Sequence, residues 1–194
     1  MLVHSTDTTA ATWIERSPTP PEQLITFGPA GFEAYGRLRF IPDPELAGQA
    51  ETDADVPEGR ELWAPQARRA LAVLADFTAT AAQCYFCVWD GVAGDVLSVA
   101  ERQGPLVTLP DRRYVLFTGR LEDYVEGRDE RFGDDAAPVP AFVWPADRRW
   151  CFTSDVDPHW AGIGAARAAV QRLLATPGLD VVEAAPAERP PAYR

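Results

Sequence analysis

The chain contains no lysine and no asparagine among its 194 residues, and it has only two histidines. Without lysine it cannot form a Walker-type phosphate loop, in which a lysine contacts the phosphates. A catalytic triad that depends on histidine would have to use His159 rather than His4, and no serine is evidently placed to join it. The Gly-x-Ser-x-Gly and His-Glu-x-x-His signatures are also absent from the sequence. These absences exclude the most common hydrolase and nucleotide-binding signatures.

Long hydrophobic runs are missing as well. No window approaches the roughly 18 apolar residues that a membrane-spanning helix needs, and the first residues lack the basic start and apolar run of a secretory signal. The three cysteines are an odd number in a chain without an export signal, which favours reduced thiols over a disulfide framework. We therefore expect a cytoplasmic protein.

Charge narrows the range of partners. All 18 basic residues are arginine, which we attribute to the codon bias of a GC-rich bacterial genome, and 29 acidic residues bring the net charge to −11. A field of that sign repels phosphate backbones and anionic lipid, so neither nucleic acid nor a membrane surface is an expected partner. Arginine favours planar, bidentate pairs with carboxylates, so internal Arg–Asp bridges are expected.

Length and apolar content fit one domain, since 194 residues with 46% hydrophobic content can fill a single substantial core. We expect an irregular, proline-containing arm at 1–30, a single α+β domain at 31–184 and a loose proline-rich tail at 185–194. The order of the expected elements, with most strands consecutive and without helical crossovers, favours a mainly antiparallel sheet packed by two helices.

Two helices and seven strands are expected within the domain. Helical spacing of apolar residues predicts one helix over 65–81, and Asp157-Pro158 predicts the start of a second that contains Ile163 and ends near Leu174. Residues 45–61 and 122–140 are acidic and indicate long loops. The alternating or continuous apolar runs that predict strands are 32–41, 84–89, 106–109, 113–118, 141–144, 150–154 and 179–182.

Cys84 and Cys87 have the spacing of a zinc knuckle or a redox dithiol. A structural zinc would need two more ligands at comparable spacing, and only Cys151 and His159 remain. Redox pairs usually lie at a helix N-terminus, whereas this pair lies in an expected strand, where an offset of three residues directs the side chains to opposite faces. We therefore interpret the cysteines as core residues and expect no metal or cofactor.

Two carboxylates and an imidazole occur within five residues at Asp155, Asp157 and His159. They could ligate a divalent cation or act as an acid–base pair. Helix capping is the alternative, because Asp157 is a suitable N-cap and Pro158 suits the first helical position. Capping leaves His159 unexplained.

The segment from Trp144 to Trp150 reads WPADRRW. Aromatic faces and guanidinium groups could form a recognition surface here. A tight strand connection, in which Asp147 bonds backbone amides and the tryptophans are buried, is the other interpretation. Gly162-Ile163-Gly164 could let amides approach a phosphate, but the third glycine and the parallel strand of a dinucleotide fingerprint are lacking.

The C-terminal half resembles a group of uncharacterised actinobacterial proteins. The resemblance covers perhaps 90 residues and rests on PDRRYVLF at 110–117, FVWPADRRWCFTSDVD at 142–157 with the following GIG segment, and the strand ending in Trp89-Asp-Gly. Val143 stands where that group has the first Trp of its WWPADRAW segment. The group implies a bacterial, cytoplasmic protein with a domain of unknown function. The layout is also distantly similar to that of small α+β immunity proteins that neutralise bacterial toxins.

We predict a non-enzymatic binding protein, immunity-like, whose partner is a protein. An acidic surface suits such a role because electrostatic steering speeds the capture of basic partners. The alternative is a small metal-dependent hydrolase that uses Asp155, Asp157 and His159. The expected binding surface combines aromatic and charged side chains, namely Trp89, Arg113, Trp144, Asp147, Arg148, Asp157, His159 and Trp160.

Overall fold

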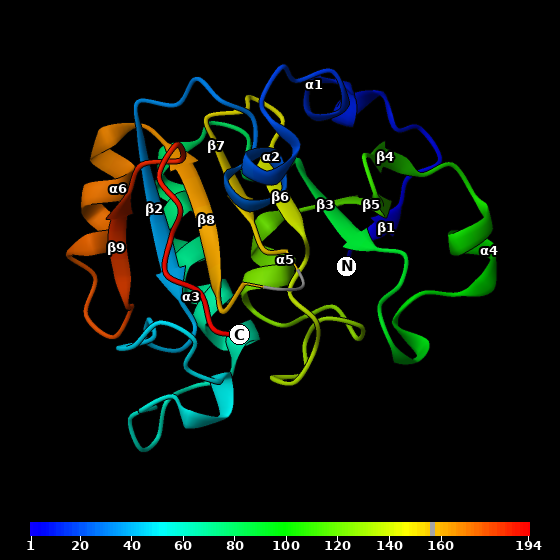
Figure 1. The fold of residues 1–194 in the computed structure, drawn as a ribbon. Coiled ribbons are helices and arrows are strands. Elements are labelled where there is room, and N and C mark those ends of the chain that lie inside the picture. Colours follow the sequence, from blue (N-terminus) through cyan, green and yellow to red (C-terminus); the bar gives the residue numbers. More distant parts are fainter. Residues whose placement is uncertain (156–157) are drawn as a thin grey trace.

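The computed structural model describes residues 1–155 and 158–194. Within them, one large antiparallel sheet of nine strands runs through the whole molecule, with helices on both of its faces (Figure 1). The strand order is β1-β5-β3-β6-β7-β8-β2-β9, and β4 pairs with β5. Every strand pair in this part of the chain is antiparallel, which confirms the predicted α+β class and antiparallel sheet. The strands are β1 Val3–His4, β2 Ala34–Arg39, β3 Cys84–Trp89, β4 Val107–Leu109, β5 Arg112–Gly119, β6 Phe142–Pro145, β7 Trp150–Thr153, β8 Trp160–Ala165 and β9 Val181–Ala184.

The helices are short, and several connections are single 3₁₀ turns. The α-helices are α1 Thr12–Glu15, α2 Pro21–Phe27, α3 Trp63–Leu74, α4 Val99–Gln103, α5 Leu121–Val125 and α6 Arg167–Leu174. The 3₁₀ turns are η1 Thr9–Ala11, η2 Glu51–Asp53, η3 Ala75–Phe77 and η4 Gly94–Val96.

The first face of the sheet is covered by three helices rather than the two expected. Buried residues of α3, α5 and α6, such as Leu71, Tyr124 and Val170, join alternate strand residues, such as Phe86 and Phe152, in one core. Because side chains alternate across a strand, the residues between them face the other side of the sheet.

The second face is covered by the N-terminal arm, which is more regular than its proline content indicates. Residues 1–30 contain β1, α1 and α2, and Pro21 takes the first position of α2, where its missing N–H is not needed. Ile14 and Leu24 are buried against Cys87, Trp144 and other residues of this face. In Figure 1, α2 lies in front of the sheet, while α3 lies behind it.

The second predicted helix begins later than expected. Residues 160–165 form strand β8, paired with β7 on one side and β2 on the other, and α6 begins only at Arg167. All six residues of β8 are buried, as in a central strand, so the apolar run that predicts the first turns of a helix is in fact a strand. Asp157, the predicted N-cap, lies outside the described residues, and the N-cap of α6 is Ala166.

Glycine at two positions of β8 allows close packing of the arm. A Cβ on Gly162 would lie 1.9 Å from the carbonyl oxygen of Thr26, and a Cβ on Gly164 would lie 2.4 Å from Phe32. Real Cβ contacts essentially never fall below 3.0 Å. The GIG segment therefore lets α2 and the loop after it rest on the sheet, and it is not a phosphate loop.

Two further boundaries differ from the sequence prediction. The helix expected over 65–81 ends as α3 at Leu74 and continues only as the turn η3, after which Thr78 is extended with φ −140° and ψ 147°. The loop expected over 122–140 begins with α5, whose Leu121 and Tyr124 are buried. No helix in the described ranges is long and apolar enough to cross a membrane.

Candidate functional site

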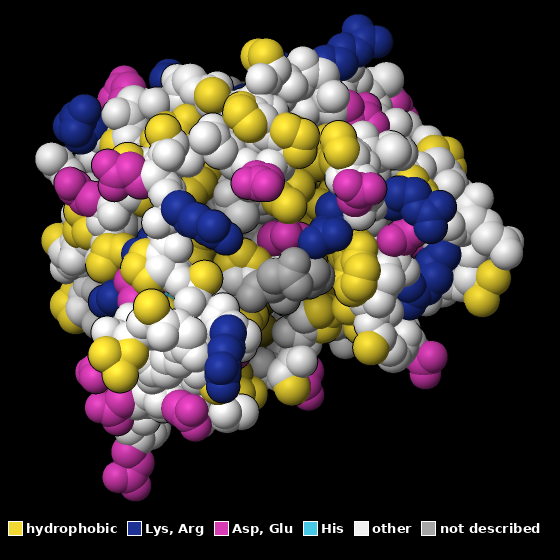
Figure 2. Space-filling model, in the orientation of Figure 1, with side chains coloured by type: hydrophobic (Ala, Val, Ile, Leu, Met, Phe, Trp, Pro, Cys, Tyr) yellow, Lys and Arg dark blue, Asp and Glu magenta, His cyan; other side chains and the backbone are white. Residues whose placement is uncertain are grey.

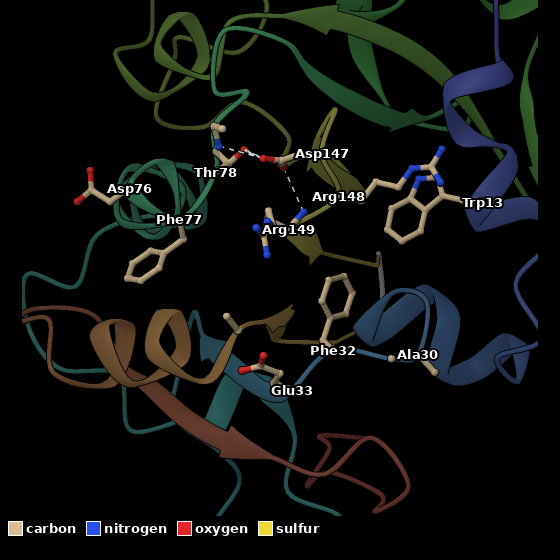
Figure 3. A pocket seen from close by; sticks show the side chains of 13 residues that line it. Trp13, Ala30, Phe32, Glu33, Asp76, Phe77, Thr78, Asp147, Arg148 and Arg149 are labelled. Atoms are coloured by element: carbon tan, nitrogen blue, oxygen red, sulfur yellow. Dashed lines mark hydrogen bonds between the residues drawn. The ribbon is translucent and has the colours of Figure 1, made fainter.

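An open groove of about 900 Å³ lies at one end of the sheet. Three segments far apart in the sequence form it: the turn between β6 and β7, the loop between α2 and β2, and the residues around the end of η3 (Figure 3). Trp13 of α1 closes one end. The volume falls within the range typical of ligand pockets, which is roughly 300–1,000 Å³.

Asp147 fixes the β6–β7 turn against η3. Its two carboxylate oxygens each lie 2.8 Å from the hydroxyl of Thr78, and they also accept the backbone N–H groups of Ala79 at 2.9 Å and Arg149 at 3.2 Å. The N–H of Asp147 itself donates to Thr80 Oγ1 at 3.1 Å. Burial acts to raise the pKa of Asp147, but these donors outweigh it and the pKa is lowered. Asp147 is therefore an ionised structural anchor of the groove.

Arg148 follows in a left-handed backbone conformation. Its N–H donates to the carbonyl of Pro145 at 2.9 Å, which closes the turn, and its φ is +55°. A turn of this kind favours glycine or asparagine, because a Cβ is crowded at positive φ. The guanidinium lies over the indole of Trp13, with Cζ 5.3 Å from the ring centroid, in a cation–π contact.

Arg149 points into the cavity between Phe77 on one side and Phe32 on the other (Figure 3). All three aromatic residues that line the groove, the third being Trp13, are partly exposed. Such side chains offer large, rigid apolar surfaces with few rotatable bonds. The groove therefore combines aromatic walls with guanidinium groups.

Two further carboxylates line the groove. Glu33 Oε2 accepts the N–H of Arg167 at 3.2 Å and so interacts with the positive N-terminus of α6. Asp76 is exposed, and Figure 3 shows its carboxylate pointing away from Arg149. Neither forms an ion pair with the groove arginines within the part of the chain that the structure describes.

The predicted binding residues lie in three separate parts of the structure, and the groove is one of them. Asp147 and Arg148 lie in it. Trp144 lies beneath it, fully buried, stacked on Tyr85 at 5.4 Å and edge-on to Trp13 at 6.2 Å. Its large apolar ring fills the second core, so Trp144 is not part of an exposed surface.

His159 and Trp160 lie at the opposite end of β8 and are 2% and 5% exposed, and both line a smaller cavity of about 550 Å³ beneath the proline-rich tail. His159 Nε2 lies 3.0 Å from Asp43 Oδ1, and Asp43 also accepts two hydrogen bonds from Arg37, at 2.7 and 2.9 Å. Trp160 lies under the guanidinium of Arg37 at 5.3 Å. These residues join β2 to β8 as a buried charged cluster.

Burial and hydrogen bonding shift the pKa values of His159 and Asp43 in this cluster. Burial lowers the pKa of His159, although the hydrogen bond to Asp43 acts in the opposite direction. Burial acts to raise the pKa of Asp43, but the hydrogen bonds from Arg37 and His159 outweigh it and bring the pKa to about 2. His159 is therefore neutral near pH 7 and Asp43 is ionised.

The proline-rich tail covers part of this cluster. The ring of Tyr193 packs edge-on to His159 at 4.8 Å, its hydroxyl donates to the carbonyl of Pro42 at 2.7 Å, and Arg194 N–H donates to Gln49 O at 3.1 Å. The tail, which the sequence indicated as loose, is thus attached at its end.

Trp89 and Arg113 form the third place. Arg113 is exposed and pairs with Asp90 at 2.8 Å, while Trp89 lies against Gly91. The predicted surface is therefore not continuous, because its members lie on different ends and faces of the sheet. Asp157 lies outside the described residues.

Two residues of the alternative hydrolase site, Asp155 and His159, already have partners, and the third, Asp157, lies outside the described residues. Asp155 is 7% exposed and pairs with Arg112 at 3.2 Å, which confirms one of the expected internal Arg–Asp bridges. His159 pairs with Asp43 as described above. No group of three or more possible metal ligands converges among residues 1–155 and 158–194.

The cysteines are core residues, as predicted from their strand. Cys84 and Cys87 lie on opposite faces of β3, one in each core, and Cys151 is buried with Cys87. Desolvation raises the pKa of Cys84 to about 12 and also raises those of the other two thiols. Thiols that stay protonated are weak nucleophiles and poor metal ligands.

Most of the residues that line the groove are not among the predicted ones, and Arg149, Phe32 and Phe77 are three of them. Arg149 directly follows a predicted residue, and its adjacency was the only local signal. Phe32 and Phe77 lie more than 40 residues apart in the sequence and reach the groove through sheet pairing and α3, so no local pattern indicates them.

No family model, no curated protein and no solved structure matches this chain. The resemblance to the actinobacterial group, and the layout similarity to immunity proteins, stay predictions.

Proposed function

We propose that the protein is a non-enzymatic binding protein, immunity-like in its mode of action, and that a partner protein contacts the groove at the β6–β7 turn. One observation carries the proposal: Arg148 and Arg149 are held by a turn that Asp147 anchors by accepting from three donors, beside aromatic side chains that stay partly exposed. Groups held in place before binding lose little conformational entropy when a partner arrives.

The distribution of acidic residues supports a partner that carries positive charge elsewhere on its surface. Residues 45–61 form a projection with six exposed carboxylates, and Figure 2 shows acidic side chains gathered at this lower-left edge. Together with the net charge of −11, this field favours the encounter with a basic protein, such as a nuclease toxin. We expect the association rate to fall as the salt concentration rises, because screening weakens this steering.

The hydrolase alternative has less support. Asp155 and His159 are each paired with another half-buried charged group, so a metal ion or a substrate would have to compete with these partners. Thermal denaturation with a panel of divalent cations separates the two proposals, because an ion that binds only the folded state raises the melting temperature. We expect no ion to raise it.

Photo-cross-linking tests the binding proposal directly. A photoreactive benzoylphenylalanine replaces Phe77 in the groove or, as the control, Val99 on α4, which is 69% exposed and lies outside the groove. Each variant is irradiated in extracts of cells that carry the gene. We expect a product from position 77 that is absent from position 99, is displaced by unlabelled protein and disappears when Arg149→Glu is added.

Identical products from both positions, or none from position 77, would overturn the proposal. The Arg149→Glu variant must retain the far-ultraviolet circular dichroism of the parent protein, so that loss of the product reports binding.

A further inference from the structure

The groove contains two cations that have no counter-ion in the described ranges. Arg148 and Arg149 are exposed, and neither forms an ion pair with another residue of 1–155 or 158–194. Most other arginines of this acidic chain are paired, including Arg37, Arg39 and Arg60 with buried or half-buried aspartates. The two groove arginines are therefore available to an anionic group.

The carboxylates beside them are directed to other groups rather than to these arginines. Asp147 already accepts from three donors, and Glu33 accepts one hydrogen bond from the N-terminus of α6. Asp76 points away from Arg149. Within the described part of the chain, the guanidinium of Arg149 consequently faces the cavity without a paired carboxylate, although the whole chain is acidic.

The backbone supports the same conclusion. Arg148 occupies a left-handed position at which glycine would be less strained, and the chain places a guanidinium there. Strained residues are found preferentially where the side chain they present has a use. The contact with Trp13 holds this guanidinium at the rim.

Resting on the proposed function, we infer that the groove binds a carboxylate of the partner, carried by a chain segment that also inserts an aromatic side chain between Phe32 and Phe77. Guanidinium groups pair with carboxylates through two parallel N–H···O bonds, which fixes the orientation of the bound segment. The aromatic walls and the volume of about 900 Å³ suit a segment of a few residues.

This local preference is compatible with steering by the net negative charge. Steering acts over long distances and is screened beyond about 8 Å at physiological ionic strength. Pairing in the groove acts at contact. A partner that is basic overall and carries an acidic, aromatic segment satisfies both.

Two synthetic dipeptides test the inference on the full chain, independently of any natural partner. N-acetyl-Asp-Phe-amide carries the carboxylate, and N-acetyl-Asn-Phe-amide is its neutral isostere. Binding is followed by NMR through the Nε–Hε signals of Arg148 and Arg149, assigned by substitution. We expect the charged peptide to shift these signals saturably and to bind about tenfold more tightly than the isostere.

Arg148→Gln and Arg149→Gln should each abolish most of this preference. Arg172→Gln, which changes an exposed arginine of α6 outside the groove, should leave it unchanged. Equal binding of the two peptides, or no saturable shift of the groove signals up to about 10 mM peptide, would overturn the inference.

The outcome is separable from that of the cross-linking experiment. A groove-specific cross-linked partner without a carboxylate preference would leave the proposed function standing and remove the inference. A carboxylate preference without any groove-specific partner would leave the carboxylate-binding site standing and remove the proposed function.

Discussion

The hydroxyl of Thr78 lies 2.8 Å from both carboxylate oxygens of Asp147, although 69 residues separate the two in the sequence. This contact joins the end of η3 to the turn between β6 and β7, and so connects two walls of the groove. The position of Arg148 and Arg149 therefore depends on a residue that does not itself face a partner.

Replacing Asp147 with alanine should lower the free energy of unfolding by about 2 kcal/mol, because several donors, two of them backbone N–H groups, lose a charged acceptor. Urea denaturation measures the change. Asp76→Ala is the matched control, since Asp76 lies in the same groove, is exposed, and makes no hydrogen bond within the described residues. Asp76→Ala should lower the free energy of unfolding by less than about 0.5 kcal/mol. Equal losses in the two variants would contradict the anchoring role of Asp147.

The positive φ of Arg148 leads to a different prediction. Arg148→Gly relieves the left-handed conformation, whereas Arg148→Ala keeps it, and both lose the contact with Trp13. The glycine variant should therefore be more stable than the alanine variant by about 1 kcal/mol. Thermal and urea denaturation of the pair measure this difference. If alanine were the more stable replacement, the turn in solution would not have this backbone conformation.

The strands show most clearly which parts of the fold could be predicted from the sequence. The continuous apolar run from Cys84 to Trp89 and the β-rich run that became β5 were placed correctly, because two-sided burial leaves a local signature. Strand β8 was missed because its residues, Trp160 to Ala165, include two glycines and alanines, which carry little β propensity. Only pairing with β2 and β7 makes this segment extended.

The site was predicted in part for a similar reason. Asp147 and Arg148 belong to a local turn, and turn chemistry can be recognised from neighbouring residues. The prediction that Trp144, His159 and Trp160 share one surface is wrong. The side chains of a sheet are distributed over two faces and two ends, and closeness in the sequence does not show on which face or at which end a side chain lies.

Gly162 gives a prediction about the attachment of the arm. A methyl group at this position would collide with the carbonyl of Thr26, which is backbone and cannot rotate away. Gly162→Ala should therefore cost about 3 kcal/mol or displace α2. Gly104→Ala is a suitable control, because its Cβ would meet nothing closer than 3.4 Å and its φ is −75°. Urea denaturation reports the cost, and protection of α2 amides from hydrogen exchange reports displacement. Equal stability of the two variants would argue against the close packing of α2 on β8.

The buried His159 makes stability depend on pH. Because burial lowers its pKa below the unfolded value of about 6.5, the unfolded chain binds a proton that the folded chain does not between the two values. The contribution of His159 to the free energy of unfolding should thus be fully present above pH about 6.5 and should decrease as the pH falls below that value. Urea denaturation between pH about 5 and 8 measures the slope. His159→Gln, which cannot titrate, should flatten it, and an unchanged slope would assign the effect to other groups.

Strand β2 lies between β8 and β9, so both of its hydrogen-bonding edges are filled by residues that lie more than 120 positions later in the chain. During synthesis on the ribosome, both edges of residues 34–39 stay without these partners until residues 160–165 and 181–184 have been made. Pairings between such distant segments form slowly, and unpaired strands are open to association with other chains. Nascent chains that stop before β8 should accordingly be the forms that require chaperones most.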